Sequence, residues 1–250
     1  MPKQSGLGDN FYLGGYDLSG DVSALTAIRM PSVLLDVTAI NKSAHERLLG
    51  LADGELSFNT WFNDAASQEH VALKGLPRTD VQALYFRGTT LGNPAAGLLA
   101  KQVNYDATRG ADGSLAFAVQ CLGQGQPLEW CQSGTAGKRT DTGATNGASI
   151  DLGTGSLSFG LAAYLQVFAF TGTSVTVAIQ ESSDDGGLDP FAAVTGGALA
   201  AVSGANVVER IQTSLTQTVE RYLRVVTTGT FTNAVFAVAI IRYGAVNQGL

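Results

Sequence analysis

The sequence predicts a mostly-β protein with two β-rich regions. Short segments alternate apolar and polar residues, turn signals rich in Gly, Asn, Asp and Thr separate them, and few segments have helical periodicity. The first region predicts a β-sandwich or barrel with a short flanking helix. The second, with regularly spaced short strands and no amphipathic helix, predicts a β-sandwich.

The opening of the chain predicts an arm, a strand and a helix. Residues 1–32 are rich in Gly, Asp and Ser and indicate an extended arm or loop. The β-branched run 33–40 predicts a strand, and residues 41–50 predict a short helix with a cap at Asn41 and a Gly stop. A second brief helix is expected at residues 67–76, where Pro77 ends it.

Four further strands are predicted in the first region, at residues 55–64, 81–87, 98–108 and 114–122. Residues 109–113 join the last two as a hairpin. The faces of these strands that do not carry core residues have small, polar or acidic side chains, and alternation puts Lys101 on the other face. We predict that these side chains could line a channel: Glu55, Ser57, Asn59, Gln102, Asn104, Asp106, Ala116, Ala118 and Gln120.

A change of composition predicts the domain boundary. Residues 133–155 are dominated by Gly, Thr, Ser, Ala and Asn, which bury little apolar surface. The predicted organisation is therefore a domain at 1–140, a linker at 141–155 and a second domain at 156–250. Strands are expected in the second domain between turn signals at 171–173, 184–187 and 228–230, namely at 163–170, 174–181, 221–227 and 234–243.

The low share of charged residues favours assembly. Charged residues make up 14% of the chain and hydrophobic ones 45%, whereas an ordinary domain has about 25% charged residues. Uncharged surfaces can be buried against copies of the chain at low desolvation cost. With a net charge of −6 and no Lys or Arg cluster, tight DNA binding is not expected, although a weakly acidic surface would let DNA slide past.

The chain offers little chemistry, and we expect neither an enzyme nor a metal or cofactor site. His45 and His70 are the groups tuned to neutral pH, and Asp184, Asp185 and Asp189 form an acidic loop without an EF-hand pattern. Two cysteines, Cys121 and Cys131, predict reduced thiols, with a local disulfide as the alternative. Neither a signal peptide nor a membrane span is evident, which predicts a soluble chain made in the cytoplasm.

Several segments of the first region resemble the major tail, or tail-tube, proteins of long-tailed bacteriophages of the siphophage type. The resemblance lies in their order across residues 33 to 123, and the segments are LDVT (35–38), HER (45–47), LADGELSF (51–58), WFN (61–63) and YDATRGADG (105–113).

This resemblance implies a structural virion protein that forms stacked hexameric rings around a DNA-conducting channel used in DNA ejection. Strands of each tail-tube-like first domain would join a continuous barrel, while loops and termini link the rings. The second region would be an immunoglobulin-like or carbohydrate-binding-like β-sandwich that decorates the exterior of the tube. The implied location is the phage tail, assembled in the host cytoplasm. The implied partners are copies of the chain and other tail proteins, namely the terminator, the tape measure and the distal tail protein.

Two other functions fit the sequence. A capsid decoration or other virion accessory protein would share the low charge and the β-sandwich. A carbohydrate-binding module could use aromatic residues of the second region to contact host-surface glycans, and the candidates are Tyr164, Phe168 and Tyr222.

Overall fold

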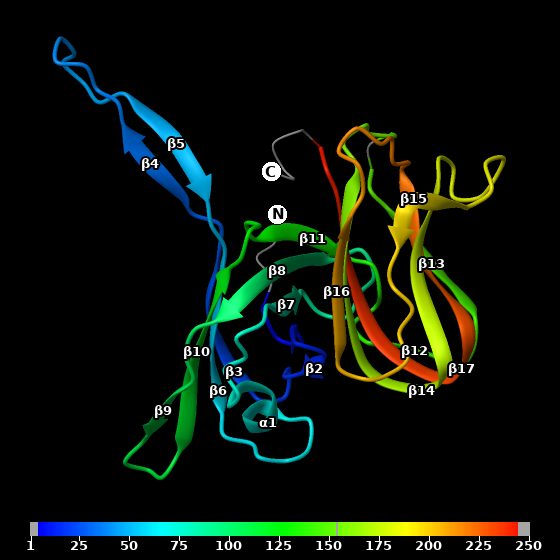
Figure 1. Cartoon of the computed structure of the whole chain (residues 1–250), viewed down its shortest axis with the longest axis horizontal. Coiled ribbons are helices and arrows are strands. Elements are labelled where there is room, and N and C mark those ends of the chain that lie inside the picture. Colours follow the sequence, from blue (N-terminus) through cyan, green and yellow to red (C-terminus); the bar gives the residue numbers. More distant parts are fainter. Residues whose placement is uncertain (1–4, 154, 245–250) are drawn as a thin grey trace.

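The computed structural model describes residues 5–153 and 155–244, and this part of the chain is mostly β, as the sequence predicts. A 15-stranded sheet runs through the molecule, and a separate two-stranded sheet projects from it (Figure 1). The elements are β1 (Asn10–Leu13), β2 (Tyr16–Asp17), β3 (Val22–Arg29), β4 (Ser32–Asp36), β5 (Arg47–Ala52), β6 (Glu55–Trp61), α1 (Glu69–Leu73), β7 (Val81–Phe86), β8 (Pro94–Gln102), β9 (Asp106–Arg109), β10 (Leu115–Gly123), β11 (Glu129–Ser133), β12 (Arg139–Asp141), β13 (Thr145–Asp151), β14 (Leu161–Ser182), β15 (Ala192–Ala198), β16 (Val207–Gln212) and β17 (Tyr222–Arg242).

The N-terminal half is a layered structure around an apolar core. Strands β3, β6 and β10 bury Leu56, Phe58 and Val119 against Phe11 and Leu13 of β1. Strand β1 pairs with β7, and β7 pairs with β8, so these three strands form the second layer. The expected helix at 67–76 is present as α1, and its Leu73 reaches the same core.

The predicted extended arm at residues 1–32 is wrong for the described residues. Strands β1 to β3 lie within it, and Phe11, Tyr12, Leu13 and Leu18 are buried. The glycines that indicated a loop include Gly14 and Gly15, which form the tight turn between β1 and β2. Their φ angles are 60° and 84°. Residues 1–4 of the predicted arm lie outside the described part.

The predicted helix at 41–50 is also wrong. Residues 41–46 form a loop, and β5 pairs antiparallel with β4, with Leu34 beside Leu49 and Leu35 beside Leu48. An isolated helix of this length is marginal in water, because helices shorter than about 12 residues rarely repay nucleation. Pairing with β4 instead satisfies the backbone along β5.

The C-terminal half is built on two long strands that bend. The turn signals at 171–173 and 228–230 do not end strands, because β14 and β17 run through them, with register shifts between Thr171 and Ser174 of β14. Gly172 and Gly229 allow the bend: a Cβ would lie 2.4 Å from the Phe231 Cα at one site and 2.3 Å from the Ser174 carbonyl oxygen at the other. Both halves of β14, with Leu165 and Val177 as examples, therefore line one core.

The segment predicted as a linker, residues 141–155, contains paired strand. Asp141 ends β12, and β13 pairs with β17 along Thr145–Asp151. Its Gly residues misled the prediction, because Gly147 is required for packing: a Cβ there would lie 2.6 Å from the Val225 carbonyl oxygen. Strand β11 pairs with both β8 and β17, so the ladder continues from one half into the other.

A buried ionic cluster holds the two halves together. The Glu129 carboxylate on β11 accepts hydrogen bonds from Arg210 at 2.9 and 3.0 Å, from the Tyr243 hydroxyl at 2.5 Å and from the Tyr164 hydroxyl. Glu129 is 3% exposed. Removing one partner of such a pair leaves an uncompensated buried charge, so the cluster fixes how the halves meet.

We predict that Gly97→Ala weakens this junction. A Cβ at Gly97 would lie 2.7 to 2.9 Å from the Tyr164 ring, which is fully buried and cannot move aside. Overpacking of this kind costs about 1–3 kcal/mol, which urea unfolding would measure. Gly20→Ala is the matched control, because nothing lies within 4 Å of its Cβ position. Equal unfolding midpoints for the two variants would contradict the prediction.

Candidate functional site

One face of the sheet β3–β6–β10–β9 carries small and polar side chains, and we call it the polar sheet face. Cross-strand partners share a face, and the register pairs Ser57 with Gln120, Asn59 with Ala118, and Ala118 with Asp106. The members from the predicted set are Glu55, Ser57, Asn59, Asp106, Ala116, Ala118 and Gln120. Strand β3 adds Ala24 and Ala27 beside Asn59 and Ser57.

Asn104 also lies at this face. Its Oδ1 accepts a hydrogen bond from the Gln120 backbone N–H at 2.7 Å, and its Nδ2 donates to Asp106 at 2.6 Å. Residues 103–105, between β8 and β9, are not strand.

The grouping of Gln102 with these residues is wrong. Gln102 is the register partner of Cys121, a core residue, and its Nε2 donates to the Leu73 carbonyl oxygen of α1 at 2.9 Å. The prediction treated residues 98–108 as one strand, in which 102, 104 and 106 would share a face. The break after Gln102 removes that relation, so the two sides of the break have independent alternation.

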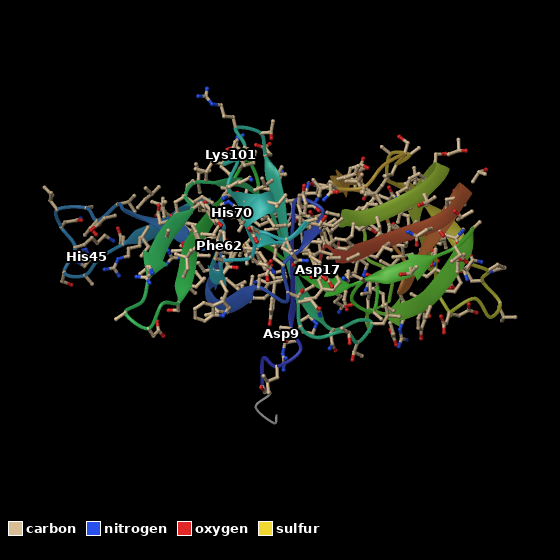
Figure 2. All side chains as sticks on the ribbon, turned by 90° about the horizontal axis from the view of Figure 1, so that it is seen from below. Asp9, Asp17, His45, Phe62, His70 and Lys101 are labelled. Atoms are coloured by element: carbon tan, nitrogen blue, oxygen red, sulfur yellow. The ribbon has the colours of Figure 1, made fainter. Side chains whose placement is uncertain are left out.

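The expected placement of Lys101 fails for the same reason. Lys101 and Glu55 are both register partners of Leu122, which puts Lys101 at the margin of the polar sheet face. The ammonium group of Lys101, which is labelled in Figure 2, lies 2.6 Å from the Asp80 carboxylate and 2.8 Å from the Arg78 carbonyl oxygen.

At the end of the polar sheet face where β6 begins, the Arg29 guanidinium neutralises the Glu55 carboxylate. Burial alone would raise the pKa of Glu55, but hydrogen bonds from Ser57, Gln120 and Arg29 outweigh it and hold that pKa below its usual range. The donors lie 2.6, 3.0 and 2.6 Å from the carboxylate. Arg29, which the sequence analysis did not identify, is thereby tied to Glu55.

Both sides of this sheet end in open edges. Within the described residues, β3 is the last strand of the sheet path and pairs with β6 alone, while β9 pairs with β10 alone. Strand β3 is eight residues long and lacks proline. An open edge of this length exposes backbone N–H and C=O groups that can pair with another strand.

The β4–β5 hairpin projects away from the body with apolar residues on both of its faces (Figure 1). Leu34 and Leu49 share one face and are 62% and 74% exposed, whereas Leu35 and Leu48 share the other and are 47% and 57% exposed. This surface was not predicted, because residues 48 and 49 were expected on a helix. The available signal was the pair of leucine runs on either side of a polar loop.

Aromatic rings gather just beyond the last residue of β6, and we call this group the aromatic end patch, made of Phe62, His70, Tyr105 and Phe117. Tyr105 stacks on Phe117 with centroids 4.1 Å apart, and Phe62 lies 5.0 Å from His70. The His70 Nδ1 is 3.0 Å from the Tyr105 hydroxyl oxygen. Figure 2 shows Phe62 beside His70, far from His45 on the hairpin loop.

Trp61, which is 51% exposed, is not part of this group. It is the register partner of Ala116 and therefore lies on the polar sheet face.

The other residues considered in the sequence, namely the remaining histidine, the acidic loop and the two cysteines, have the following contacts. His45 contacts Asp36 at 2.9 Å on the exposed hairpin, and Asp184 accepts hydrogen bonds from the backbone N–H groups of its own loop. Cys121 and Cys131 are free and buried. No group of three or more His, Cys, Asp or Glu residues in the described part is arranged to hold a metal ion.

Two further findings concern glycan contact and membranes. Tyr164 is fully buried with its hydroxyl on Glu129, and Phe168 packs against Tyr12 at a centroid distance of 4.9 Å. Of the three aromatic candidates, Tyr222 is therefore the one without a place in the core, and the Arg221 guanidinium lies over its ring.

Among residues 5–153 and 155–244, no helix is long and apolar enough to cross a membrane.

Behind the aromatic end patch lies a buried acid, Glu69, which gives a pH prediction. Burial raises the pKa of Glu69, and hydrogen bonds from Tyr105 and the Asn63 N–H offset this only in part. The folded state therefore keeps this proton at pH values where the unfolded chain has lost it, and the associated stability is lost as pH rises above about 4.5 through the folded-state pKa.

Glu69→Gln should flatten this part of the stability profile. The expected result is a smaller loss of unfolding free energy between pH 4.5 and 7 than in the unmodified chain, measured by urea unfolding at several pH values. Asp64→Asn, at an exposed position nearby, is the control and should leave the slope unchanged. Parallel profiles for the Glu69 variant and the unmodified chain would contradict the assignment.

Comparison with known proteins gives structural likeness to components of phage tails and related particles. A chain from the virion of the native gene transfer agent (GTA) particle is 15% identical, with a TM-score of 0.41, over 51% of this chain and 98% of that chain. The Dit protein of phage SPP1, described as a paradigm of the hub adsorption apparatus in Gram-positive infecting phages, is 11% identical with a TM-score of 0.33. It covers 94% of this chain and 99% of its own.

A chain of the phage p2 baseplate in its activated conformation is 8% identical, with a TM-score of 0.36, over 94% of this chain and 98% of that chain. No protein-family model matches the sequence, and no curated protein matches it. At these TM-scores and identities, the likeness assigns neither a family nor a function to the chain.

Proposed function

We propose that the protein is a structural phage-tail subunit of the tail-tube type, which assembles as stacked, hexameric rings around a DNA-conducting channel. The observation that carries this proposal is the sheet β3–β6–β10–β9, which combines a polar, small-residue face with two open edges. Open edges allow copies to pair side by side, and closure into a ring removes both edges.

The polar sheet face suits the lumen of such a ring. Its exposed members include Ala118 and Asp106, and its one Arg on β3 is paired with Glu55. A DNA duplex would therefore meet small, neutral or acidic groups and, at one end of the face, the Trp61 ring, with no row of cations to bind its phosphates. This chemistry supports passage of DNA rather than its retention.

The layering supports an outward position for the C-terminal half. Phe11 and Leu13 of β1 face the core beneath the polar sheet face, whereas Tyr12 of the same strand faces the junction with Tyr164. The C-terminal half thus lies behind two layers of strands from the polar face (Figure 1). In a ring with that face inward, this half would decorate the outside.

The same proposal includes the partners of the tube. The terminator, the tape measure and the distal tail protein would be its partners within the tail.

Negative-stain microscopy of the purified full chain tests this function. The proposal expects rings with a central hole, and short tubes at high protein concentration. Monomers or trimers at every concentration would contradict it and favour a decoration protein or a carbohydrate-binding module. Rings that never stack would point to a hub of the kind described for the SPP1 protein.

The orientation of the sheet gives a separate prediction for Ala118→Lys. Six added lysines in the lumen should make the rings retain duplex DNA, and the log of the binding constant should fall with log salt by about 0.9 for each phosphate neutralised. Filter binding at several salt concentrations measures this slope.

Ala193→Lys is the matched control for the DNA experiment, because Ala193 is also an exposed strand alanine but lies in β15 of the C-terminal half. Both variants should unfold at the same urea concentration as the unmodified chain. Equal DNA binding by the two lysine variants would show that the polar sheet face does not line the channel.

A further inference from the structure

The connection between β6 and β7, residues 62–80, contains α1 and lies at the end of the sheet opposite the β4–β5 hairpin (Figure 1). We call it the α1 segment. Its helix has five residues, and a helix shorter than about 12 residues is marginal on its own in water. Ser67 and Leu76, on either side of the helix, have φ of 63° and 40°, which is unfavourable for a residue with a Cβ. The segment is therefore held in place by its contacts with the body of the protein.

Both apolar and polar contacts join the α1 segment to the body. Leu73 is fully buried in the core beneath the polar sheet face, and its carbonyl oxygen accepts a hydrogen bond from the Gln102 Nε2 at 2.9 Å. The Asp21 carboxylate accepts hydrogen bonds from the Glu69 N–H at 3.1 Å and from the Asn63 Nδ2 at 2.8 Å. Asp21 is 7% exposed, so one nearly buried carboxylate anchors the segment.

A second buried carboxyl group, that of Glu69, lies beside this anchor. Glu69 is fully buried, and its Oε1 has no hydrogen-bond partner within the described residues. Burial raises the pKa of Glu69 and the Asp21 charge adds to this, whereas Tyr105, the Asn63 N–H and His70 favour the charged form but do not outweigh burial. The site therefore suits a protonated carboxyl group better than a carboxylate.

We propose that the α1 segment is a proton-controlled strap, which is closed over the core while Glu69 keeps its proton and opens locally when that proton is lost. In the closed form, a deprotonated Glu69 is a second negative charge beside Asp21 and away from water. Opening moves this carboxylate into water, where it is stable. The open form is therefore increasingly favoured as pH rises above 4.5, the ordinary pKa of a glutamate.

Opening of the strap divides the aromatic end patch. Phe62 and His70 belong to the α1 segment, whereas Tyr105 and Phe117 belong to the body. The ring centroids are 6.0 Å apart for Phe62 and Phe117 and 5.8 Å apart for His70 and Tyr105. Loss of these contacts would uncover Phe117, which is 8% exposed in the closed form, and the core around Leu73. This control acts within a single chain, so it is independent of the tail-tube proposal.

Hydrogen exchange of the full chain tests the strap. The reporters are the Ala72 and Lys74 N–H groups, which bond to carbonyl oxygens of the preceding turn at 3.1 and 3.2 Å. Their protection factors, corrected for the intrinsic pH dependence of exchange, should be lower than those of β8 amides. They should also fall between pH 4.5 and 7, by up to about tenfold per pH unit. Equal protection of α1 and β8 at every pH would show that the segment opens only when the whole protein unfolds, and would overturn the inference.

Glu69→Gln removes the proton and keeps the size of the side chain. The fall in α1 protection with pH should disappear in this variant, whatever its protection at pH 4.5. Asp64→Asn removes an exposed carboxylate from the same segment and should leave the fall unchanged. A fall that persists in the Glu69 variant would assign the titration to another group and overturn the inference.

Tyr105→Phe provides a second test that leaves Glu69 in place. The phenyl ring can still stack on Phe117, but the hydroxyl that favours the charged form of Glu69 is gone. Protection of the α1 amides should therefore decrease more at pH 7, where the carboxylate forms, than at pH 4.5. An equal decrease at the two pH values would show a purely structural role for the hydroxyl and would count against the strap.

Discussion

The structure depends on one constraint: each strand of the sheet β3–β6–β10–β9 has two faces, and the described part of this chain provides a core for only one of them. Alternation in β6 and β10 sends Leu56, Phe58 and Val119 into that core. The opposite residues must then be compatible with solvent or with a neighbouring molecule. The polar sheet face and the open edges belong to a sheet whose second face the described part of this chain does not cover.

Period-two alternation made the central strands predictable from sequence, whereas context decided the rest. The faces of β6 and β10 were correct because Leu56 to Thr60 and Phe117 to Cys121 alternate without interruption. Gln102 and Lys101 were misplaced because the strand breaks after Gln102, and nothing in the local sequence reports that break. The helix predicted at 41–50 has acceptable caps, but its second half instead pairs with the preceding strand β4 as a hairpin.

Glycine explains the other differences between prediction and structure. Glycines in the segments predicted as a linker and as turns permit close backbone approach inside paired strands, as at Gly147, Gly172 and Gly229. Composition alone does not distinguish a flexible segment from one that packs tightly, because both uses need the absence of a side chain. The low share of charged residues is equally ambiguous as a composition. Only the strand register shows which uncharged residues lie together on one face of a sheet.

The strand β11, which pairs with β8 on one side and β17 on the other, has a mechanical consequence. A flexible linker would let the outer half swing and would absorb a pull on it. Here a pull on the C-terminal half is carried directly into the inner sheet through backbone hydrogen bonds and the Glu129–Arg210 contact. A force applied to the C-terminal half is therefore transmitted along the paired strands β11, β8 and β10 to β6.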